Sequence, residues 1–90
     1  MDTSLPGSEI SEIENIVNSD PRVHSWHELR TRKSGSQRHI DLHIVLRNDA
    51  SFVEAHQIAD DLEKIIARRF AQAHVVIHVD PYDASKDARQ

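Results

Sequence analysis

The sequence predicts a small α+β domain in which helices cover one face of a three-stranded sheet. Two segments place apolar residues at the three- and four-residue spacing of an amphipathic helix, and three segments show the alternation or apolar content of strands. Their order along the chain is helix, strand, strand, helix, strand. A hairpin followed by a crossover helix and a third strand leaves the helices on one face of the sheet and the other face open. Ninety residues are enough for one such domain.

The first helix is expected to run from Ser8 to Asn18, after a polar leader at residues 1–7. Its apolar side chains recur at helical spacing and are Ile10, Ile13, Ile16 and Val17. Ser8 is a suitable N-cap residue, and Glu9 lies in the first turn, where the helix dipole favours an acidic side chain. Pro21 ends the helix because the residue before a proline is disfavoured in the helical conformation.

Two strands are expected next, at about residues 22–31 and 37–47, and a polar loop at residues 33–36 joins them. The loop contains Gly35 and is longer than a two-residue hairpin turn. The second strand alternates clearly, with Ile40, Leu42, Ile44 and Leu46 on one side and His39, Asp41, His43 and Val45 on the other. The aliphatic set predicts the core face of this strand, and the polar set predicts its open face.

A turn at Asn48–Asp49 precedes a long helix that is expected to end near Phe70. Ser51 and Glu54 form a capping box at its start, because each side chain can satisfy a free backbone donor of the other residue. The predicted buried stripe of this helix comprises Ala55, Ile58, Leu62, Ile65, Ile66 and Phe70.

The last strand is expected at residues 74–80, where Val75, Ile77 and Val79 face the core. Pro81 ends this strand, and residues 82–90 are expected to form a flexible tail. The folded domain is therefore expected to span residues 8–81.

Charge and composition argue against several classes of function. The formal net charge is −4, which disfavours nucleic acid and anionic lipid as partners and favours cations. The chain has no cysteine, which excludes disulfides, thiolate ligands and the paired cysteines of a copper chaperone. No apolar run approaches the roughly 20 residues of a membrane helix, and no signal peptide is visible. Taken alone, the chain is expected to be soluble.

The open face of the predicted sheet carries side chains that can ligate metals. His78 and Asp80 are two residues apart on the last strand, so both project from the same face. His43 lies on the open face of the second strand, His27 lies in the first strand, and His56 lies in the first turns of the long helix. Neutral imidazole and carboxylate groups are suitable ligands for zinc and other divalent first-row metals. Three strands and a helix end could therefore converge on one metal site.

Other histidines have a simpler interpretation. A single histidine on a strand is usually a partly exposed residue with a hydrogen bond. His24, His39 and His74 are interpreted in this way, although the last two share the open face. Trp26 is the only tryptophan, and it is interpreted as a core or dimer-interface residue.

Four segments in order resemble the C-terminal cytoplasmic domain of the cation diffusion facilitator transporters. They are HELRTRKSG at residues 27–35, IDLHIVL at 40–46, EAHQIADDLEKII at 54–66 and VIHVDP at 76–81. The resemblance covers residues 5–81, and MDTSLP resembles the link that follows the last membrane helix in that family. Each segment alone is unspecific, but the order, the intervals and the residue types all agree.

The resemblance implies a metallochaperone-like, ferredoxin-type domain that forms a homodimer on the cytosolic side of a membrane transporter. In that family, metal at the dimer interface draws two arms together and favours efflux of divalent cations. The matching ligand positions are His27, His43, His56, His78 and Asp80, with the carboxylate placed to bridge two metals. Zinc is the expected metal, and the ligand types also admit manganese, iron, cobalt, nickel and cadmium. The membrane half is missing from this chain, so the chain alone is not expected to transport.

The expected function is therefore the sensing of cytosolic metal by a dimer that tightens when metal binds. Five candidate ligands exceed the four of one tetrahedral zinc site, which predicts more than one ion per chain. A rival interpretation is a regulatory α/β domain for a small organic effector, but only two glycines are available for the loops of such a pocket. A nucleic-acid module would show aromatic residues and a basic patch on its open face. An enzyme is not expected, because no nucleophile motif or separate general base is recognisable.

Overall fold

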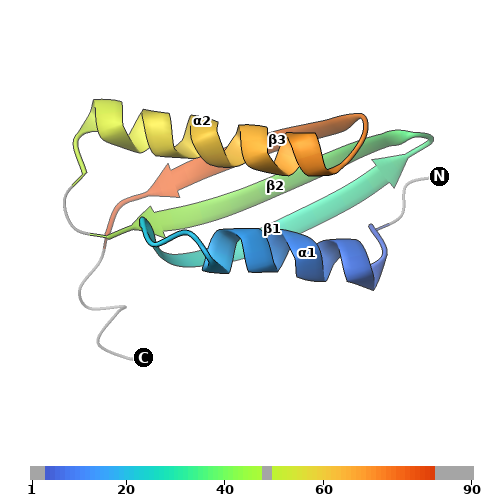
Figure 1. Cartoon of the computed structure of the whole chain (residues 1–90), viewed down its shortest axis with the longest axis horizontal. Coiled ribbons are helices and arrows are strands. Elements are labelled where there is room, and N and C mark those ends of the chain that lie inside the picture. The colour runs from blue at the N-terminus through green and yellow to red at the C-terminus, as the bar shows by residue number, and fades with distance from the viewer. Residues whose placement is uncertain (1–3, 48–49, 83–90) are drawn as a thin grey trace.

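The computed structural model describes residues 4–47 and 50–82. Its elements in order are α1 (Gly7–Asn18), β1 (Val23–Ser34), β2 (Gln37–Leu46), α2 (Phe52–Arg69) and β3 (Ala73–Asp80). β2 lies at the centre of the sheet, antiparallel to β1 and parallel to β3 (Figure 1). The predicted α+β order and three-stranded sheet are confirmed. The turn predicted at residues 48–49 lies outside the described residues, and so does the tail predicted at residues 82–90 except for Tyr82.

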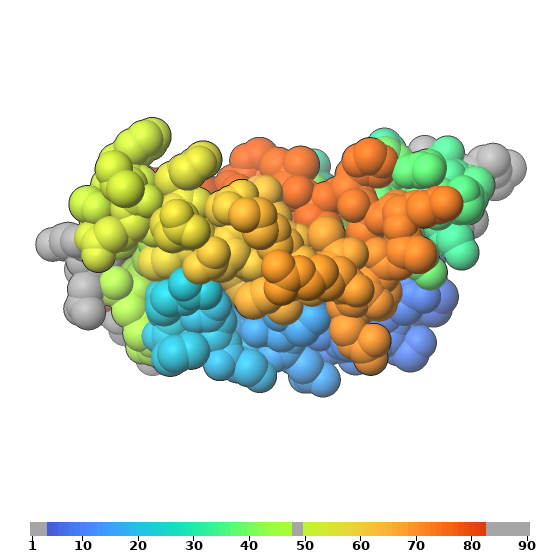
Figure 2. Space-filling model, turned by 45° about the horizontal axis from the view of Figure 1, so that its top comes forward, coloured from blue at the N-terminus to red at the C-terminus, as the bar shows by residue number. Residues whose placement is uncertain are grey.

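The two helices cover one face of the sheet. Figure 2 shows α2 and α1 side by side in front of the strands, along the long direction of the molecule. The molecule is elongated, with principal extents of 40 × 28 × 20 Å. Within the described ranges, neither helix is long and apolar enough to cross a membrane.

The core lies between the helices and the central strand. The buried residues that meet there include Ile40, Leu42, Ile44 and Leu46 from β2, Ile13 and Val17 from α1, and Leu62 and Ile66 from α2. Burial of an aliphatic side chain stabilises a fold by about 1.5–3 kcal/mol, so this layer provides much of the driving force for folding. The alternation predicted for β2 is confirmed residue by residue.

The buried stripe of α2 differs from the prediction, and its first two predicted members, Ala55 and Ile58, are only partly buried against the core. Leu62, Ile66 and Phe70 are buried as predicted, but Ala59 is buried as well, and Ile65 is 42% exposed. The buried residues recur every three or four positions and define one line along the helix. Ile65 lies about 100° around the helix from Ile66, so it points away from that line.

The edge strand β3 is covered less completely than β2. Ile77 is buried and Val75 packs partly against the core, as predicted, but Val79 is 37% exposed near the end of the strand. β3 also begins one residue earlier than predicted, at Ala73.

The β1–β2 hairpin is longer and tighter than predicted. The two strands pair as far as Ser34 and Gln37, so only Gly35 and Ser36 connect them. Gly35 has a φ of 61°, a left-handed conformation that glycine adopts without a steric cost. The polar residues before the turn are paired strand residues, because an exposed strand end needs no apolar side chains. The prediction of a longer loop is therefore wrong.

β1 contains a bulge beside its histidine. The register with β2 changes between His27 and Arg30, so Glu28 and Leu29 together lie opposite a single residue of β2. Glu28 has a φ of 53°, which is uncommon for a residue other than glycine. An extra residue of this kind bends the strand and increases its twist.

Residues before α1 pack against the domain, although a polar leader was predicted there. α1 begins at Gly7 with Pro6 as its N-cap residue and no capping side chain, so the predicted N-cap at Ser8 is wrong. Leu5 is buried in the core, and its backbone N–H donates to Thr31 Oγ1 at 3.3 Å. The packed part of the chain thus includes residues before the helix.

The start of α2 has the predicted capping box. The backbone N–H of Glu54 donates to Ser51 Oγ at 3.1 Å, and the backbone N–H of Ser51 donates to Glu54 Oε1 at 3.0 Å. These bonds hold the pKa of the Glu54 carboxyl below its usual value, with the backbone N–H of Ser51 as the main cause.

An arginine network joins the α1–β1 connection to α2. Arg22 donates to Asp20 Oδ2 at 2.7 Å and to Asp61 Oδ2 at 3.0 Å. The Arg22 guanidinium is the main cause that lowers the pKa of both carboxyls. This network lies on the helix-covered side and links two elements that also share the core.

Candidate metal centre

Three histidines form a row across the open face of the sheet. The strand register places His43 of β2 opposite His27 of β1 on one side and opposite His78 of β3 on the other. The His27 and His43 rings stack with centroids 5.3 Å apart, and the His43 and His78 rings stack at 4.6 Å. The row exists because the alternation of β2 directs His43 away from the core.

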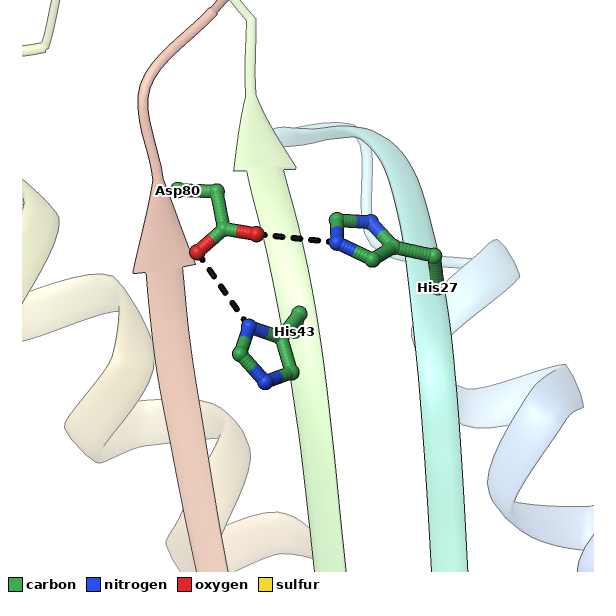
Figure 3. A group of neighbouring side chains, drawn as sticks. All are labelled: His27, His43 and Asp80. Carbon is green, nitrogen blue, oxygen red and sulfur yellow. Dashed lines mark hydrogen bonds and ion pairs between the residues drawn. The ribbon is translucent and has the colours of Figure 1, made fainter.

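Asp80 joins two members of this row. Its Oδ2 lies 2.9 Å from His27 Nε2, and its Oδ1 lies 3.2 Å from His43 Nδ1. Figure 3 shows the carboxylate between the two rings, with each side chain supplied by a different strand. We call His27, His43 and Asp80 the first group; their potential ligand atoms all lie within 4.8 Å of one another.

His78 takes part in a different set of contacts. Its Nε2 lies 2.8 Å from Asp41 Oδ1. Asp41, His43 and His78, which we call the second group, also offer ligand atoms within 4.8 Å of one another. His78 and Asp80 project from the same face as predicted, but they belong to separate groups, and the residue common to both is His43.

Both groups have ligand types that suit a divalent metal ion. Each contains two imidazoles and one carboxylate, the set that zinc and similar ions accept in proteins. The side chains of His27, His78 and Asp41 are 40–46% exposed, so an ion can reach them from solvent. In the first group, the two oxygens of Asp80 contact His27 Nε2 and His43 Nδ1, so both rings face one carboxylate.

A further carboxylate lies beside the row. Glu28, in the bulge of β1, has Oε2 at 3.9 Å from His43 Nε2, and the same oxygen is 3.6 Å from Arg30. The bulge thus adds a negative charge near His43, which Arg30 partly compensates.

One predicted ligand lies elsewhere. His56 is exposed on the first turns of α2, the helix that covers the opposite face, and it belongs to neither group. The predicted convergence of three strands is therefore present within one chain, but the helix end does not join it.

The remaining histidines have other contacts. His39 and His74 stack at 5.3 Å, and His74 Nε2 lies 2.9 Å from Gln37 Oε1. His24 lies edge-on to Tyr82 at 5.4 Å. The interpretation as a partly exposed, hydrogen-bonded residue agrees with the contacts of His74, whereas the contacts described for His39 and His24 are ring contacts. Trp26 packs partly against the core, and its Nε1 donates to Asn18 Oδ1 at 2.7 Å.

The sequence reasoning overlooked Asp41 as a member of the centre. The alternation of β2 had already placed it on the open face between two histidines. Its contact with His78 depends on the parallel register of β2 and β3, which pairs His43 with His78 and so sets Asp41 diagonally beside that ring.

The fold and this row of histidines define a small α+β domain whose open face carries side chains that could hold a divalent cation. Residues 5–82 match the model of the cytoplasmic domain of cation efflux proteins, and the chain belongs to that family. Over 81 residues it is 44% identical to the cation-efflux pump FieF of Escherichia coli (strain K12 / DH10B), and equally so to that of Shigella boydii serotype 18. The alignments cover 90% of this chain and 27% of each pump. The chain therefore spans about a quarter of the length of these relatives.

Solved structures agree with this assignment. The chain resembles CzrB, to which zinc transport has been assigned, with a TM-score of 0.81, 32% identity, and coverage of 88% of this chain and 99% of the other. For the zinc form of CzrB, the TM-score is 0.74 with 33% identity and coverage of 90% and 93%. The metal-bound C-terminal domain of the CzcD transporter from Thermotoga maritima gives a TM-score of 0.74, 26% identity, and coverage of 86% and 94%.

Proposed function

We propose that the chain is the dimeric, metal-binding regulatory domain of a cation efflux transporter, facing the cytosol and responding mainly to zinc. The observation that carries this proposal is the first group, in which three strands bring His27, His43 and Asp80 into contact on the open face. These residues would hold the ion, and the ion would supply positive charge that the carboxylate and imidazoles share. The role is binding, and no catalytic step is needed.

The relatives support the binding of a metal cation and a place for this domain within a cation efflux transporter. FieF is a cation-efflux pump, CzrB has a zinc form, and the CzcD domain is metal-bound. Because this chain matches only 27% of each pump, transport itself would belong to a longer protein that contains membrane-spanning segments. The domain alone would bind metal and change its association.

The position of His56 supports a dimer. Among the described residues of one chain, His56 belongs to neither group, so a ligand role for it at this centre would require a second chain. Phe52 and Val53 precede it on α2 and are 87% and 75% exposed, which gives a second chain apolar surface to cover. Burial of apolar surface is the main driving force of most protein association.

Metal would act on the dimer through differential affinity. If an ion binds the closed arrangement of two chains more tightly than the open one, it shifts the population toward closure by that difference and no more. Ligands from two chains produce such a difference, because only the closed arrangement brings them together. The domain would thus convert cytosolic zinc concentration into a change of shape.

The test is zinc calorimetry on the wild type, His78→Ala and Asp80→Ala, with His74→Ala as the matched control. His74 is an exposed histidine of the same strand that belongs to neither group. Both site variants should bind zinc at least tenfold more weakly, and the control should bind as the wild type does. Unchanged binding in both site variants would contradict the assignment.

Sedimentation with and without zinc tests the second half of the proposal. Zinc should strengthen the wild-type dimer, and His56→Ala should weaken this zinc response while leaving the fold intact. A dimer whose strength is the same with zinc and with a chelator would show that metal does not act on association.

A further inference from the structure

A second row of side chains crosses the open face near the β1–β2 hairpin. The register pairs His39 of β2 with Arg32 of β1 on one side and with His74 of β3 on the other. His39 precedes the β2 histidine of the metal centre by four residues, so the two rows lie about 13 Å apart. The hairpin is at the opposite end of the sheet from the last residues of β3 (Figure 1). We call Arg32, His39 and His74, with Arg30 beside them, the hairpin row.

The hairpin row differs from the metal centre in charge. The place that His27 occupies in the metal centre is taken here by Arg32, whose guanidinium is always protonated and cannot ligate a metal. Arg30 lies two residues before it on the same face of β1, and its side chain is 75% exposed. Two fixed positive charges beside two imidazoles disfavour a cation and favour an anion.

A surface hollow of about 600 Å³ borders the hairpin row. Arg30, Arg32, His39 and His74 all line this hollow, and Val76 adds apolar surface. Volumes of this size are typical of sites for small ligands. The hollow therefore brings two guanidinium groups and two imidazoles to one space that a small anion can enter.

The half-buried ring of His39 has a polar group to offer to a ligand. Among the described residues, this ring stacks on His74 at 5.3 Å but makes no hydrogen bond or ion pair. His74 differs, because its Nε2 lies 2.9 Å from Gln37 Oε1. A neutral imidazole always carries one N–H donor, so His39 can donate to an acceptor oxygen in the hollow.

We propose that the hairpin row binds a phosphate-type anion. The guanidinium groups of Arg30 and Arg32 would supply charge-assisted hydrogen bonds, and the His39 ring would supply a further donor. Arginine presents its N–H groups in a planar fork that matches two phosphate oxygens, and such bonds are stronger than those between neutral groups. Free phosphate and the headgroup of an anionic phospholipid share this chemistry. The inference does not depend on the proposed metal-binding function.

Two carboxylates oppose an anion at this row. Asp41 also lines the hollow, but its Oδ1 lies 2.8 Å from His78 Nε2, so its charge is directed toward the metal centre. Glu28 lies 3.6 Å from Arg30 at an exposed position, where water screens the pair. With two arginines and one aspartate, the residues that line the hollow have a formal charge of +1, although the whole chain has −4. Binding should therefore be weak and should decrease as salt is added.

The experiment titrates inorganic phosphate into the metal-free 90-residue chain and follows its backbone amide signals by NMR at constant ionic strength. The variants are Arg30→Gln, Arg32→Gln and His39→Ala, with Arg68→Gln as the matched control. Arg68 is an exposed arginine in the last turn of α2 that does not line the hollow. Because no metal is present, failure of the proposed zinc binding would leave this measurement unaffected.

Phosphate should shift the amide signals of the hairpin row in the wild type, and the shifts should saturate. Arg30→Gln and Arg32→Gln should each weaken the affinity by at least about fivefold, since each removes charge-assisted hydrogen bonds. His39→Ala should weaken it by about threefold, through the loss of one neutral hydrogen bond. Arg68→Gln should keep the wild-type affinity although it removes the same charge.

Vesicles distinguish the two sources of the phosphate group. Flotation with phosphatidylglycerol vesicles measures binding to an anionic headgroup, and phosphatidylcholine vesicles serve as the reference. Retention on the anionic vesicles that Arg32→Gln abolishes would assign the site to lipid. Saturable binding of phosphate without such retention would assign it to a free anion.

Two results would overturn the inference. The first is the absence of a saturable shift at the hairpin row, together with vesicle retention that is absent or unaffected by Arg32→Gln. The arginines would then be solvated residues of a strand end. The second is an equal change of phosphate binding in Arg32→Gln and Arg68→Gln, which would show that the anion responds only to the net charge.

Discussion

The two faces of the central strand differ in what fixes their side chains. On the helix-covered face, Ile40, Leu42 and Ile44 belong to one buried cluster with residues of both helices and have almost no exposure to solvent. On the open face, His43 is held by a hydrogen bond to Asp80 and by ring stacking with His27 and His78 of the neighbouring strands. Under the proposed function, residues one position apart on β2 would therefore serve stability and metal binding separately. A substitution on the helix-covered face should leave metal binding nearly unchanged, and a substitution on the open face should leave the stability of the fold nearly unchanged.

The largest expected effect comes from the core face. Ile44→Ala should lower the free energy of unfolding by about 2–5 kcal/mol, because the side chain is fully buried at the centre of the sheet and its loss leaves a cavity. Denaturation with urea, followed by circular dichroism, measures the loss. Ile65→Ala, at a partly exposed position of α2, should cost much less and serves as the control. Equal costs at the two positions would contradict the assignment of the core.

The next largest effect concerns the stability that zinc adds by binding to the open face. Zinc at about 100 times its dissociation constant should stabilise the wild type by about 2.7 kcal/mol, because it binds only the folded chain. His43→Ala should abolish most of this increment, since His43 belongs to both groups, while the metal-free stability changes little. Melting temperature with zinc and with a chelator checks both statements. A large loss of metal-free stability in His43→Ala would mean that the open face also supports the fold.

A smaller effect concerns the arginine network on the helix side. Asp20 accepts three hydrogen bonds from Arg22, and its side chain is 8% exposed. Asp20→Asn should therefore cost about 1–2 kcal/mol at neutral pH. The lowered pKa of the Asp20 and Asp61 carboxyls means that their stabilisation is complete above the unfolded value near 3.8 and is lost as pH falls through the folded value.

Urea midpoints measured from pH 7 down to pH 2 test this dependence. The wild type and Asp20→Asn should differ most at neutral pH and converge in acid. Parallel curves over the whole range would show that the Asp20 carboxylate adds nothing to the fold.

The smallest effect is expected at the start of α2. Ser51→Ala removes one half of the capping box and should cost about 0.5–2 kcal/mol. Zinc affinity at the first group should not change, because none of its three residues lies on α2. Ser51→Asp should restore most of the stability, since aspartate is also a good N-cap residue. A loss of zinc affinity in Ser51→Ala would show that α2 and the open face are coupled.

The sequence predicted the parts of the fold that local patterns determine. The alternation of β2 and the capping box at Ser51 are local, and both are confirmed. The two-residue turn after β1 was missed because polar residues at an exposed hairpin end resemble a loop. The burial of Leu5 was missed because it depends on packing against residues far away in the chain.

The sequence predicted most residues of the candidate centre, but it did not predict how these residues are grouped. Residue types and the resemblance pointed to four of the side chains that the structure brings together. The division into two groups depends on strand register, which decides that Asp80 meets His27 and that Asp41 meets His78. No local sequence pattern determines that register. His56 lies outside both groups, and its role as a ligand stays a prediction.

The bulge at Glu28 shifts the alternation of side chains along β1 by one residue. Side chains of a strand alternate between faces, so one inserted or deleted residue exchanges the faces for everything on one side of it. With the extra residue present, both His27 and Arg30 point to the open face although they are three positions apart. Deleting Glu28 would leave Leu29 alone opposite Leu42, so regular alternation would keep both His27 and Arg30 on the open face and the bulge would be lost. The bulge therefore lets β1 carry an extra acidic residue beside the histidine row without turning either half of the strand over.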